Sequence, residues 1–237
     1  MTTTTTCASF HDLRAFAAGG KPAADPFGAD RRALPLHENG AIETGAIDLP
    51  AGSGTTSALE GDWFLLAATG AVTIATATGE VALGENDSCA LPSGAVVTWR
   101  ADAPATLIYM RYMEAAPGSQ ALTAIQLDAP LNPSNPPLAE LLVGETPSCR
   151  SNTQWRAADG WFNAGVWDST PYFRKPMRYV HYELMYLLQG SVTFVDESGS
   201  EGTFRQGDVF IVERDSLCSW DSREDVAKVW VIWRKPA

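Results

Sequence analysis

Two ionisable side chains stand inside apolar, strand-like stretches in the second half of the chain. Glu183 lies within Tyr182–Leu188, and Lys228 lies within Val226–Trp233. An unpaired charge among buried apolar groups costs several kcal/mol, so each side chain needs a counter-charge or a ligand. Two interpretations stay open. The residues form a structural ion pair, or they line a pocket where burial and a nearby ammonium tune a carboxylate for proton transfer.

A histidine precedes this glutamate by two residues and shares its side of the strand. Side chains alternate with period two along a strand, so His181 and Glu183 point to the same face. An imidazole at that position can share or shuttle a proton. The catalytic candidates are therefore Glu183, His181 and Lys228.

The same alternation predicts that aromatic side chains surround Glu183. Their flat apolar rings and polar tips would form a pocket of the kind that binds small organic molecules. For each aromatic residue the alternative is plain core packing, and for the cysteine it is an inert buried thiol. The ligand-binding candidates are Trp167, Arg178, Tyr179, Tyr186, Cys218, Trp220 and Trp230.

A cationic cluster, Arg174, Lys175 and Arg178, precedes the Glu183 segment. Arginine forks match carboxylates, so the cluster favours an anionic ligand such as a carboxylate. For Arg174 and Lys175 the simpler interpretation is solvated charge near a turn.

The chain contains an internal repeat, because residues 45–112 recur as residues 165–233 with a displacement of 120 and later 121 positions. Gly70, for example, recurs as Gly190. Two copies of one fold are predicted, and positions that differ in chemistry between them are where function is expected.

At those positions the first copy is uncharged. Trp63 corresponds to Glu183, and Leu107 corresponds to Lys228. The first copy is therefore predicted to have lost its site, and the second to carry it.

Strand-forming segments at regular spacing, separated by turns, fill both copies. The chain has 20 Gly, 15 Pro and eight Trp in 237 residues, a composition typical of short strands and tight turns. We expect an all-β protein with one antiparallel jelly-roll barrel per repeat. The expected domains are an arm (1–40) with a short helix near Phe10–Ala18, a degenerate barrel (41–125), a proline-rich linker (126–150) that cannot form a ladder, and a barrel carrying the site (151–237).

The second copy resembles the cupin superfamily, most closely the branch of ureidoglycine aminohydrolase-like and ethanolamine-utilisation cupins. The features that carry the resemblance are Glu183 followed after six residues by Gly190, then Gly207-Asp208, Trp220 and Lys228-Val-Trp230. The resemblance implies two tandem cupin barrels, a bicupin, and hydrolase chemistry on a nitrogenous or carboxylate substrate.

The histidines that hold a metal in a typical cupin are not matched here. Their positions fall on Pro176 and Arg178, or on Met177 and Tyr179, and on Cys218. We therefore expect no cofactor. A divalent metal held by His181, Glu183 and Cys218 is the alternative, because transition metals need three or four converging N, O or S donors.

Net charge, apolar runs and cysteine spacing limit the classes of partner and the cellular location that we expect. A net charge of -11 opposes nucleic acid and anionic lipid, so neither is expected as a partner. The sequence shows no signal-peptide pattern and no long apolar run, which predicts a cytoplasmic protein. Four scattered cysteines predict no structural disulfide. The expected partner is a small molecule, and whether the chain also forms a homodimer stays open.

Three functions compete on this evidence. The first is a metabolic enzyme that acts on a small polar or carboxylate metabolite in the C-terminal barrel, by hydrolysis, aminohydrolysis or proton transfer. The second is a noncatalytic ligand-binding or sensory protein without metal. The third is a structural or assembly partner with both pockets filled by side chains.

Overall fold

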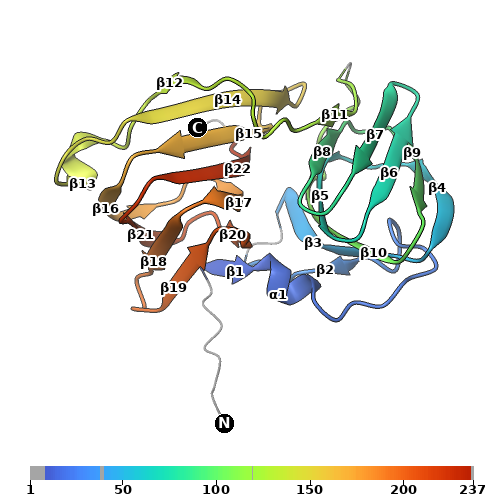
Figure 1. The fold of residues 1–237 in the computed structure, drawn as a ribbon, viewed down its shortest axis with the longest axis horizontal. Helices are drawn as coiled ribbons and strands as arrows, with labels where there is room; N and C mark the ends of the chain where they lie inside the picture. Colours follow the sequence, from blue (N-terminus) through green and yellow to red (C-terminus); the bar gives the residue numbers. More distant parts are fainter. Residues whose placement is uncertain (1–8, 38–39, 119, 236–237) are drawn as a thin grey trace, which may run out of the picture.

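The computed structural model describes residues 9–37, 40–118 and 120–235, and in it the chain forms two jelly-roll barrels side by side (Figure 1). Almost every element is a strand, and the helical elements described are α1 (Leu13–Ala17) and the 3-10 turn η1 (Ala139–Leu141). Within these described ranges, no helix has the length and apolar character needed to cross a bilayer. The predicted all-β class with two jelly-roll barrels is confirmed.

The first barrel consists of a six-stranded sheet, in the order β11-β8-β5-β10-β3-β2, facing a four-stranded sheet, in the order β4-β9-β6-β7. All pairs are antiparallel. The strands are β2 (Arg32–Ala33), β3 (Ile42–Leu49), β4 (Gly52–Ala58), β5 (Asp62–Thr69), β6 (Val72–Thr76), β7 (Gly79–Leu83), β8 (Ser88–Leu91), β9 (Val96–Ala101), β10 (Ala105–Tyr112) and β11 (Thr123–Ala124).

The second barrel repeats this plan with a seven-stranded sheet, β1-β20-β17-β22-β15-β14-β12, and a five-stranded sheet, β13-β16-β21-β18-β19. Its strands are β1 (Phe10–Asp12), β12 (Asn132–Ser134), β13 (Leu142–Val143), β14 (Cys149–Arg156), β15 (Phe162–Ser169), β16 (Tyr172–Arg178), β17 (Tyr182–Gln189), β18 (Ser191–Val195), β19 (Glu201–Arg205), β20 (Val209–Val212), β21 (Leu217–Ser222) and β22 (Val226–Trp233).

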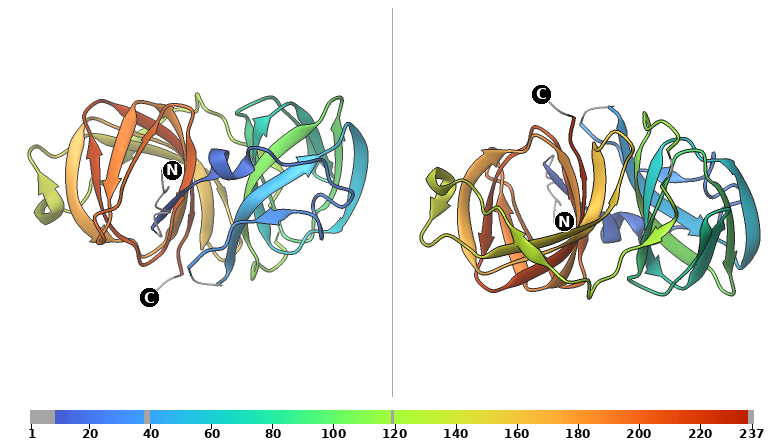
Figure 2. Two further views of the ribbon diagram at one scale, coloured as in Figure 1. Left: turned by 90° about the horizontal axis from the view of Figure 1, so that it is seen from below. Right: turned by 90° about the horizontal axis from the view of Figure 1, so that it is seen from above.

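The larger sheets of the two barrels pack against each other, so their central strands are buried on both faces (Figure 2). On β5, Phe64 and Leu66 belong to the core between the barrels, while Trp63 and Leu65 belong to the first barrel's interior. On β17, Leu184 faces the other barrel. Burial on both faces explains why these strands read as continuous apolar runs, whereas β9 alternates strictly between exposed and buried residues.

Gly70 and Gly190 make the same turn at the end of β5 and β17. Both have φ of +74°, a backbone conformation that glycine adopts without steric cost. A Cβ at Gly190 would lie 2.3 Å from the Asp225 carbonyl oxygen, and one at Gly70 would lie 2.9 Å from that of Pro104. The repeat seen in the sequence is therefore a repeat of backbone geometry.

The N-terminal arm contacts both barrels. Its strand β1 pairs with β20, and Phe10 packs in the second barrel with its ring 5.7 Å from that of Phe194. Helix α1 follows, capped by the Asp12 side chain, which accepts from the Ala15 amide, and lies within the predicted helical segment. Phe27 then enters the first barrel, 6.3 Å from Trp63.

The predicted proline-rich linker differs from the expectation in one respect, because parts of it do join ladders. Strand β12 includes Pro133 and pairs with β14, while β13 pairs with β16. Both are short strands at the outer edges of their sheets, where a residue without a backbone donor is tolerated. The inference that prolines prevent pairing there was therefore wrong, and the segment forms part of the second barrel's wall.

Candidate functional site

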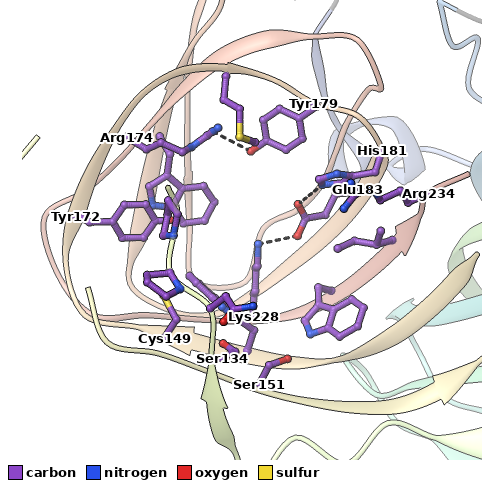
Figure 3. Close-up of a pocket in the computed structure, with 18 residues that line it drawn as sticks. Ser134, Cys149, Ser151, Tyr172, Arg174, Tyr179, His181, Glu183, Lys228 and Arg234 are labelled. Atoms are coloured by element: carbon purple, nitrogen blue, oxygen red, sulfur yellow. Dashed lines mark hydrogen bonds and ion pairs between the residues drawn. The ribbon is translucent and has the colours of Figure 1, made fainter. Parts of the chain in front are cut away.

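A cavity of about 510 Å³ opens between the two sheets of the second barrel (Figure 3). The residues that line it come from both sheets and from the segment around β12. They are Ser134, Asn135, Pro136, Pro137, Cys149, Ser151, Trp167, Tyr172, Arg174, Met177, Tyr179, His181, Glu183, Trp220, Lys228, Trp230, Ile232 and Arg234.

Glu183 and Lys228 meet inside this cavity. They project from the neighbouring strands β17 and β22, and Lys228 Nζ lies 2.8 Å from Glu183 Oε1, with both side chains less than a tenth exposed. The ammonium also lies 4.8 Å and 5.0 Å from the ring centroids of Trp167 and Trp220. The Lys228 charge is thus held by a carboxylate on one side and by two indole faces on the other.

His181 completes the ionic group, with its Nε2 3.2 Å from Glu183 Oε2. Burial pushes the pKa of Glu183 up, but the Lys228 ammonium and the hydrogen bonds from His181 and Lys228 outweigh it and lower the pKa to about 2. Glu183 is therefore a carboxylate, which only accepts hydrogen bonds, so His181 Nε2 carries the proton. In the neutral imidazole, Nδ1 is then the nitrogen that can accept one.

Arg174 and Tyr179 face the cavity from the other side. Arg174 is 3% exposed, and its Nη2 lies 3.3 Å from both the Tyr179 hydroxyl and the Cys218 carbonyl oxygen. Nη1 has no hydrogen-bond partner among the described residues. The simpler sequence-based interpretation of Arg174 as a solvated surface charge is therefore wrong, whereas Lys175 is exposed as that interpretation expects.

Aromatic rings form the remaining walls. The Tyr172 and Trp220 rings stack with centroids 5.6 Å apart and planes 7° apart, and Trp167 meets Trp220 edge-on at 6.1 Å. Trp230 also lines the cavity, and its buried Nε1 has no partner among the described residues. Four of the predicted ligand-binding residues, Trp167, Tyr179, Trp220 and Trp230, thus lie at the cavity together with the three catalytic candidates.

Three other ligand-binding candidates lie elsewhere. Tyr186 is three residues from Glu183 and so projects from the opposite face of β17, where it packs in the core between the barrels. Arg178 is exposed and donates to the Asp215 carbonyl oxygen. Cys218 is fully buried in the second barrel's apolar core and does not line the cavity.

The alternative metal site is not assembled. Among the described residues, no group of three or more His, Cys, Asp or Glu side chains converges as metal ligands would. Glu183 already has a cation, the Lys228 ammonium, at hydrogen-bond distance. The residues present therefore do not fit a divalent transition metal, which needs three or four such donors. The described cysteines Cys89, Cys149 and Cys218 are buried thiols, and Cys7 lies outside the described residues.

Several lining residues were missed by the sequence analysis. Ile232 follows Trp230 by two residues, so strand parity alone indicates it. Ser134 to Pro137 come from the linker, and no local signal places a linker over a barrel mouth. Tyr172 carries no charge or motif that distinguishes it from the core aromatics.

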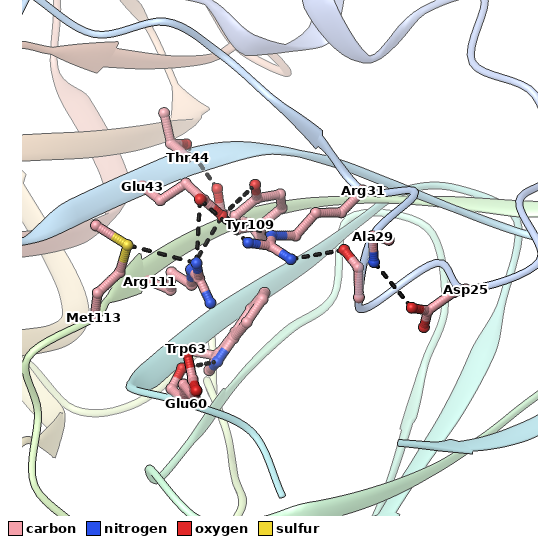
Figure 4. A network of polar contacts seen from close by, with 11 residues as sticks. Asp25, Ala29, Arg31, Glu43, Thr44, Glu60, Trp63, Tyr109, Arg111 and Met113 are labelled. Carbon is pink, nitrogen blue, oxygen red and sulfur yellow. Dashed lines mark hydrogen bonds and ion pairs between the residues drawn. The ribbon is translucent and has the colours of Figure 1, made fainter. Parts of the chain in front are cut away.

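The first barrel is filled at the corresponding place (Figure 4). Trp63, the counterpart of Glu183, is fully buried with its ring 5.2 Å from that of Tyr109. Phe27 from the arm packs beside it. Above them, Glu43 lies between Arg31 and Arg111, at 2.7 Å and 3.0 Å, and accepts from the Tyr109 hydroxyl. This carboxylate is satisfied by protein groups alone.

Comparisons with known proteins agree with this architecture. Residues 156–230 match the family described as the EutQ-like cupin domain. No match is found among curated proteins. A crystal structure of a protein of unknown function of the DUF861 family, from Pseudomonas syringae pv. tomato, is 28% identical, with a TM-score of 0.82 over 95% of this chain and 93% of that one.

Two more distant structures share the fold. Protein Ylba from E. coli, also of the DUF861 family, is 15% identical, with a TM-score of 0.59 over 97% of this chain and 93% of that one. A mutant form of the salicylate 1,2-dioxygenase from Pseudoaminobacter salicylatoxidans is 12% identical, with a TM-score of 0.54 over 85% of this chain and 76% of that one. At these identities the likeness is one of fold.

Proposed function

For this chain, a bicupin of the cupin superfamily, we propose that the second barrel binds a small polar metabolite and carries out proton-transfer chemistry on it. The observation that supports this most is the buried group of Lys228, Glu183 and His181 at the wall of the cavity. A purely structural ion pair has no need of a histidine or of a cavity beside it. The expectation of a cytoplasmic location stays a prediction.

In the proposed mechanism, the proton moves from the ligand to His181 Nδ1. Glu183 acts as a positioning residue, because its carboxylate accepts from Nε2, fixes the tautomer and stabilises the imidazolium that forms. Lys228 places a positive charge beside the ligand, where it stabilises negative charge as it develops. This replaces the role of acid or base expected for Glu183 from the sequence, since a carboxylate with a pKa of about 2 does not carry a proton near neutral pH.

The proposal also covers the reaction class. In the hydrolase-like or aminohydrolase-like form that the resemblance implied, His181 Nδ1 takes a proton from a water molecule as the water oxygen bonds to the ligand. The imidazolium then returns that proton to the leaving group as the bond to it breaks. Because the cavity residues do not fit a divalent metal, no step here is assigned to one.

A direct test uses the full chain and a panel of small hydroxy acids, amino acids, amides and ureides in D₂O. NMR would follow both incorporation of solvent deuterium and bond cleavage. We expect the wild type to convert at least one compound. The Glu183→Gln variant should lose conversion at a temperature where it is still folded, although its melting temperature is lower because Lys228 is left buried without its counter-charge. Glu43→Gln, which alters the ion-paired carboxylate of the first barrel, is the matched control and should retain conversion.

Two results would overturn this proposal. The first is a wild type that is neither stabilised by nor active on any panel member. The second is a Glu183→Gln variant that converts the same compound at the wild-type rate.

The second candidate is noncatalytic binding, which the low pKa of Glu183 favours. A group with a pKa of about 2 suits holding a ligand better than exchanging protons at neutral pH. Stabilisation of the wild type by a panel member, without deuterium incorporation or cleavage, would select this function.

A further inference from the structure

Arg174 is a buried cation with no carboxylate beside it among the described residues, in contrast to Lys228 across the cavity. Arg174 is 3% exposed, and its guanidinium forms no ion pair with any of the described residues. A charge removed from water without a counter-charge costs several kcal/mol, because arginine stays protonated at all ordinary pH. Lys228, by contrast, is neutralised by Glu183. The Tyr179 ring, whose centroid lies 5.2 Å from Arg174 Cζ, offsets this charge in part but carries no negative charge of its own. The buried positive charge at Arg174 therefore favours an anion that the protein itself does not supply.

The hydrogen bonds around Arg174 show where such an anion would bind. Nη2 donates to the Tyr179 hydroxyl and to the Cys218 carbonyl oxygen, whereas Nη1 has no partner among the described residues. Burial keeps the pKa of Tyr179 well above its usual value, so the hydroxyl keeps its own proton. Having accepted from Arg174, the Tyr179 hydroxyl still has that proton to donate. Two donors, Arg174 Nη1 and the Tyr179 O–H, thus lie together at one side of the cavity (Figure 3).

We infer that Arg174 and Tyr179 form a carboxylate anchor, and that the ligand of the second barrel is a small organic carboxylate. Its carboxylate accepts from Arg174 Nη1 and the Tyr179 hydroxyl, in the charge-assisted geometry typical of arginine. The remainder of the ligand then extends toward Lys228 and His181 between the aromatic walls, a placement that rests on the proposed function. A cavity of about 510 Å³ limits the ligand to a small metabolite.

The charge balance of the cavity supports this assignment. Of the buried charges that line it, Glu183 neutralises Lys228, and Arg174 is left without a carboxylate among the described residues, so a neutral or cationic ligand leaves that positive charge unbalanced. The unpartnered Nε1 of Trp230 adds a further donor and no acceptor.

The test measures binding by the intact chain, with Trp167, Trp220 and Trp230 at the cavity as fluorescence reporters. The probes are glycolate, succinate and benzoate, their neutral amides, and inorganic phosphate and chloride. We expect at least one carboxylate to quench the fluorescence and raise the melting temperature, while its amide does neither. Arg174→Met should raise the Kd for that carboxylate about 10-fold or more. Arg178→Met, an exposed arginine four residues away, should leave it unchanged.

A second readout separates an anchor from a structural arginine. If the Arg174 charge is uncompensated until a ligand arrives, ligand-free Arg174→Met should melt no lower than the ligand-free wild type. A structural arginine would give the opposite result, a lower melting temperature with unchanged affinity, and that result overturns the inference.

The outcomes also separate this inference from the proposed function. Binding of the neutral amides but not the carboxylates, in a manner that Glu183→Gln abolishes, would leave the proposed function standing and reject the carboxylate anchor. Equal binding of phosphate, chloride and carboxylates would reject the anchor as a carboxylate site, since it would then be a general anion site. Binding of no probe by the wild type would count against both.

Discussion

The two barrels share a backbone plan and differ in how the space between their sheets is used. In the first, Trp63 fills the interior against Phe27 and Tyr109. In the second, the counterpart of Trp63 is Glu183, a smaller and charged side chain, and a cavity remains beside it. The residue type at this position, together with the segment that docks beside it, distinguishes a barrel with a packed interior from one with a cavity.

The arm and the linker reinforce that difference. The arm inserts Phe27 at the interior of the first barrel, while another of its phenylalanines, Phe10, packs in the core of the second barrel against Phe194 and Phe204 and does not line the cavity. The linker residues Ser134 to Pro137 reach the second cavity but only line its wall. The arm thus fills the first barrel beside Trp63, whereas the linker leaves the space beside Glu183 open.

The largest effect should come from removing the cation of the second barrel. Lys228→Met leaves Glu183 buried without its counter-charge, which typically costs about 3–5 kcal/mol. Because its pKa is lowered in the folded protein, the stability that Glu183 gains from its partners is fully present above about pH 4.5. That stability is lost as the pH falls toward 2. The difference between variant and wild type should therefore shrink in acid, as measured by urea unfolding at pH 7 and pH 4.

The controls for this prediction come from the repeat itself. Leu107→Met, at the uncharged counterpart of Lys228, should cost less than about 1.5 kcal/mol, since Leu and Met differ little in volume. The double variant Glu183→Gln with Lys228→Met should recover most of the loss, because no unpaired charge remains. A penalty of equal size in both barrels would show that volume, and not charge, distinguishes the two sites.

The next largest effect is expected at Phe27, the arm residue that fills the interior of the first barrel. Phe27→Ala removes a buried ring from the space beside Trp63 and should cost about 3 kcal/mol of unfolding free energy, from lost burial and the cavity left behind. The affinity of the second barrel for a carboxylate probe should not change. Phe10→Ala is the matched variant in the second barrel and should cost a similar amount. A change in that affinity on Phe27→Ala would mean that the barrels are energetically coupled.

A smaller difference is expected at the repeated turn. Gly70→Ala places a side chain at positive φ, which costs about 1–2 kcal/mol. Gly190→Ala pays the same conformational cost, and its Cβ also meets the Asp225 carbonyl oxygen at 2.3 Å, closer than the 2.9 Å contact at Gly70. We expect Gly190→Ala to be the more destabilising by about 1 kcal/mol or more in denaturant unfolding. Equal losses would show that the second barrel relaxes around the added methyl group.

Much of the fold followed from the sequence because its signals are local or repeated. The internal repeat and the turn residues indicated two jelly-roll barrels, and charges in apolar strands indicated Glu183 and Lys228, which do meet. Parity along a regular strand placed His181 correctly, and the same rule, applied to Tyr186, shows that it belongs on the opposite face.

Two other features could not be derived in this way. In β16 the register shifts between Arg174 and Met177, so counting by twos fails there: Arg174 points into the cavity and Arg178 points to solvent. Pro176 lies in this irregularity, where a missing backbone donor is tolerated. The docking of the arm and linker depends on contacts between residues far apart in sequence, which no local pattern encodes.

The smallest effect is expected at Asp62, a buried carboxyl group on strand β5 of the first barrel. Asp62 precedes Trp63 and corresponds to Tyr182, which precedes Glu183 in the second barrel. Burial raises the pKa of Asp62 to about 6, against a hydrogen bond from the Ser93 amide that lowers it, with Asp159 adding a smaller increase. The folded protein therefore binds this proton more tightly than the unfolded chain, so stability falls as the pH rises from about 4 to about 6.

Asp62→Asn should remove that fall, because an amide oxygen can still accept from Ser93 and carries no charge. We expect the variant to be about 1 kcal/mol more stable than the wild type at pH 8 and nearly equal to it at pH 4.5, by thermal unfolding at both values. Tyr182→Phe, at the corresponding position of the second barrel, should show no such pH dependence. If Asp62→Asn is instead less stable at pH 8, the ionised carboxylate contributes more through its hydrogen bond to Ser93 than it loses through burial.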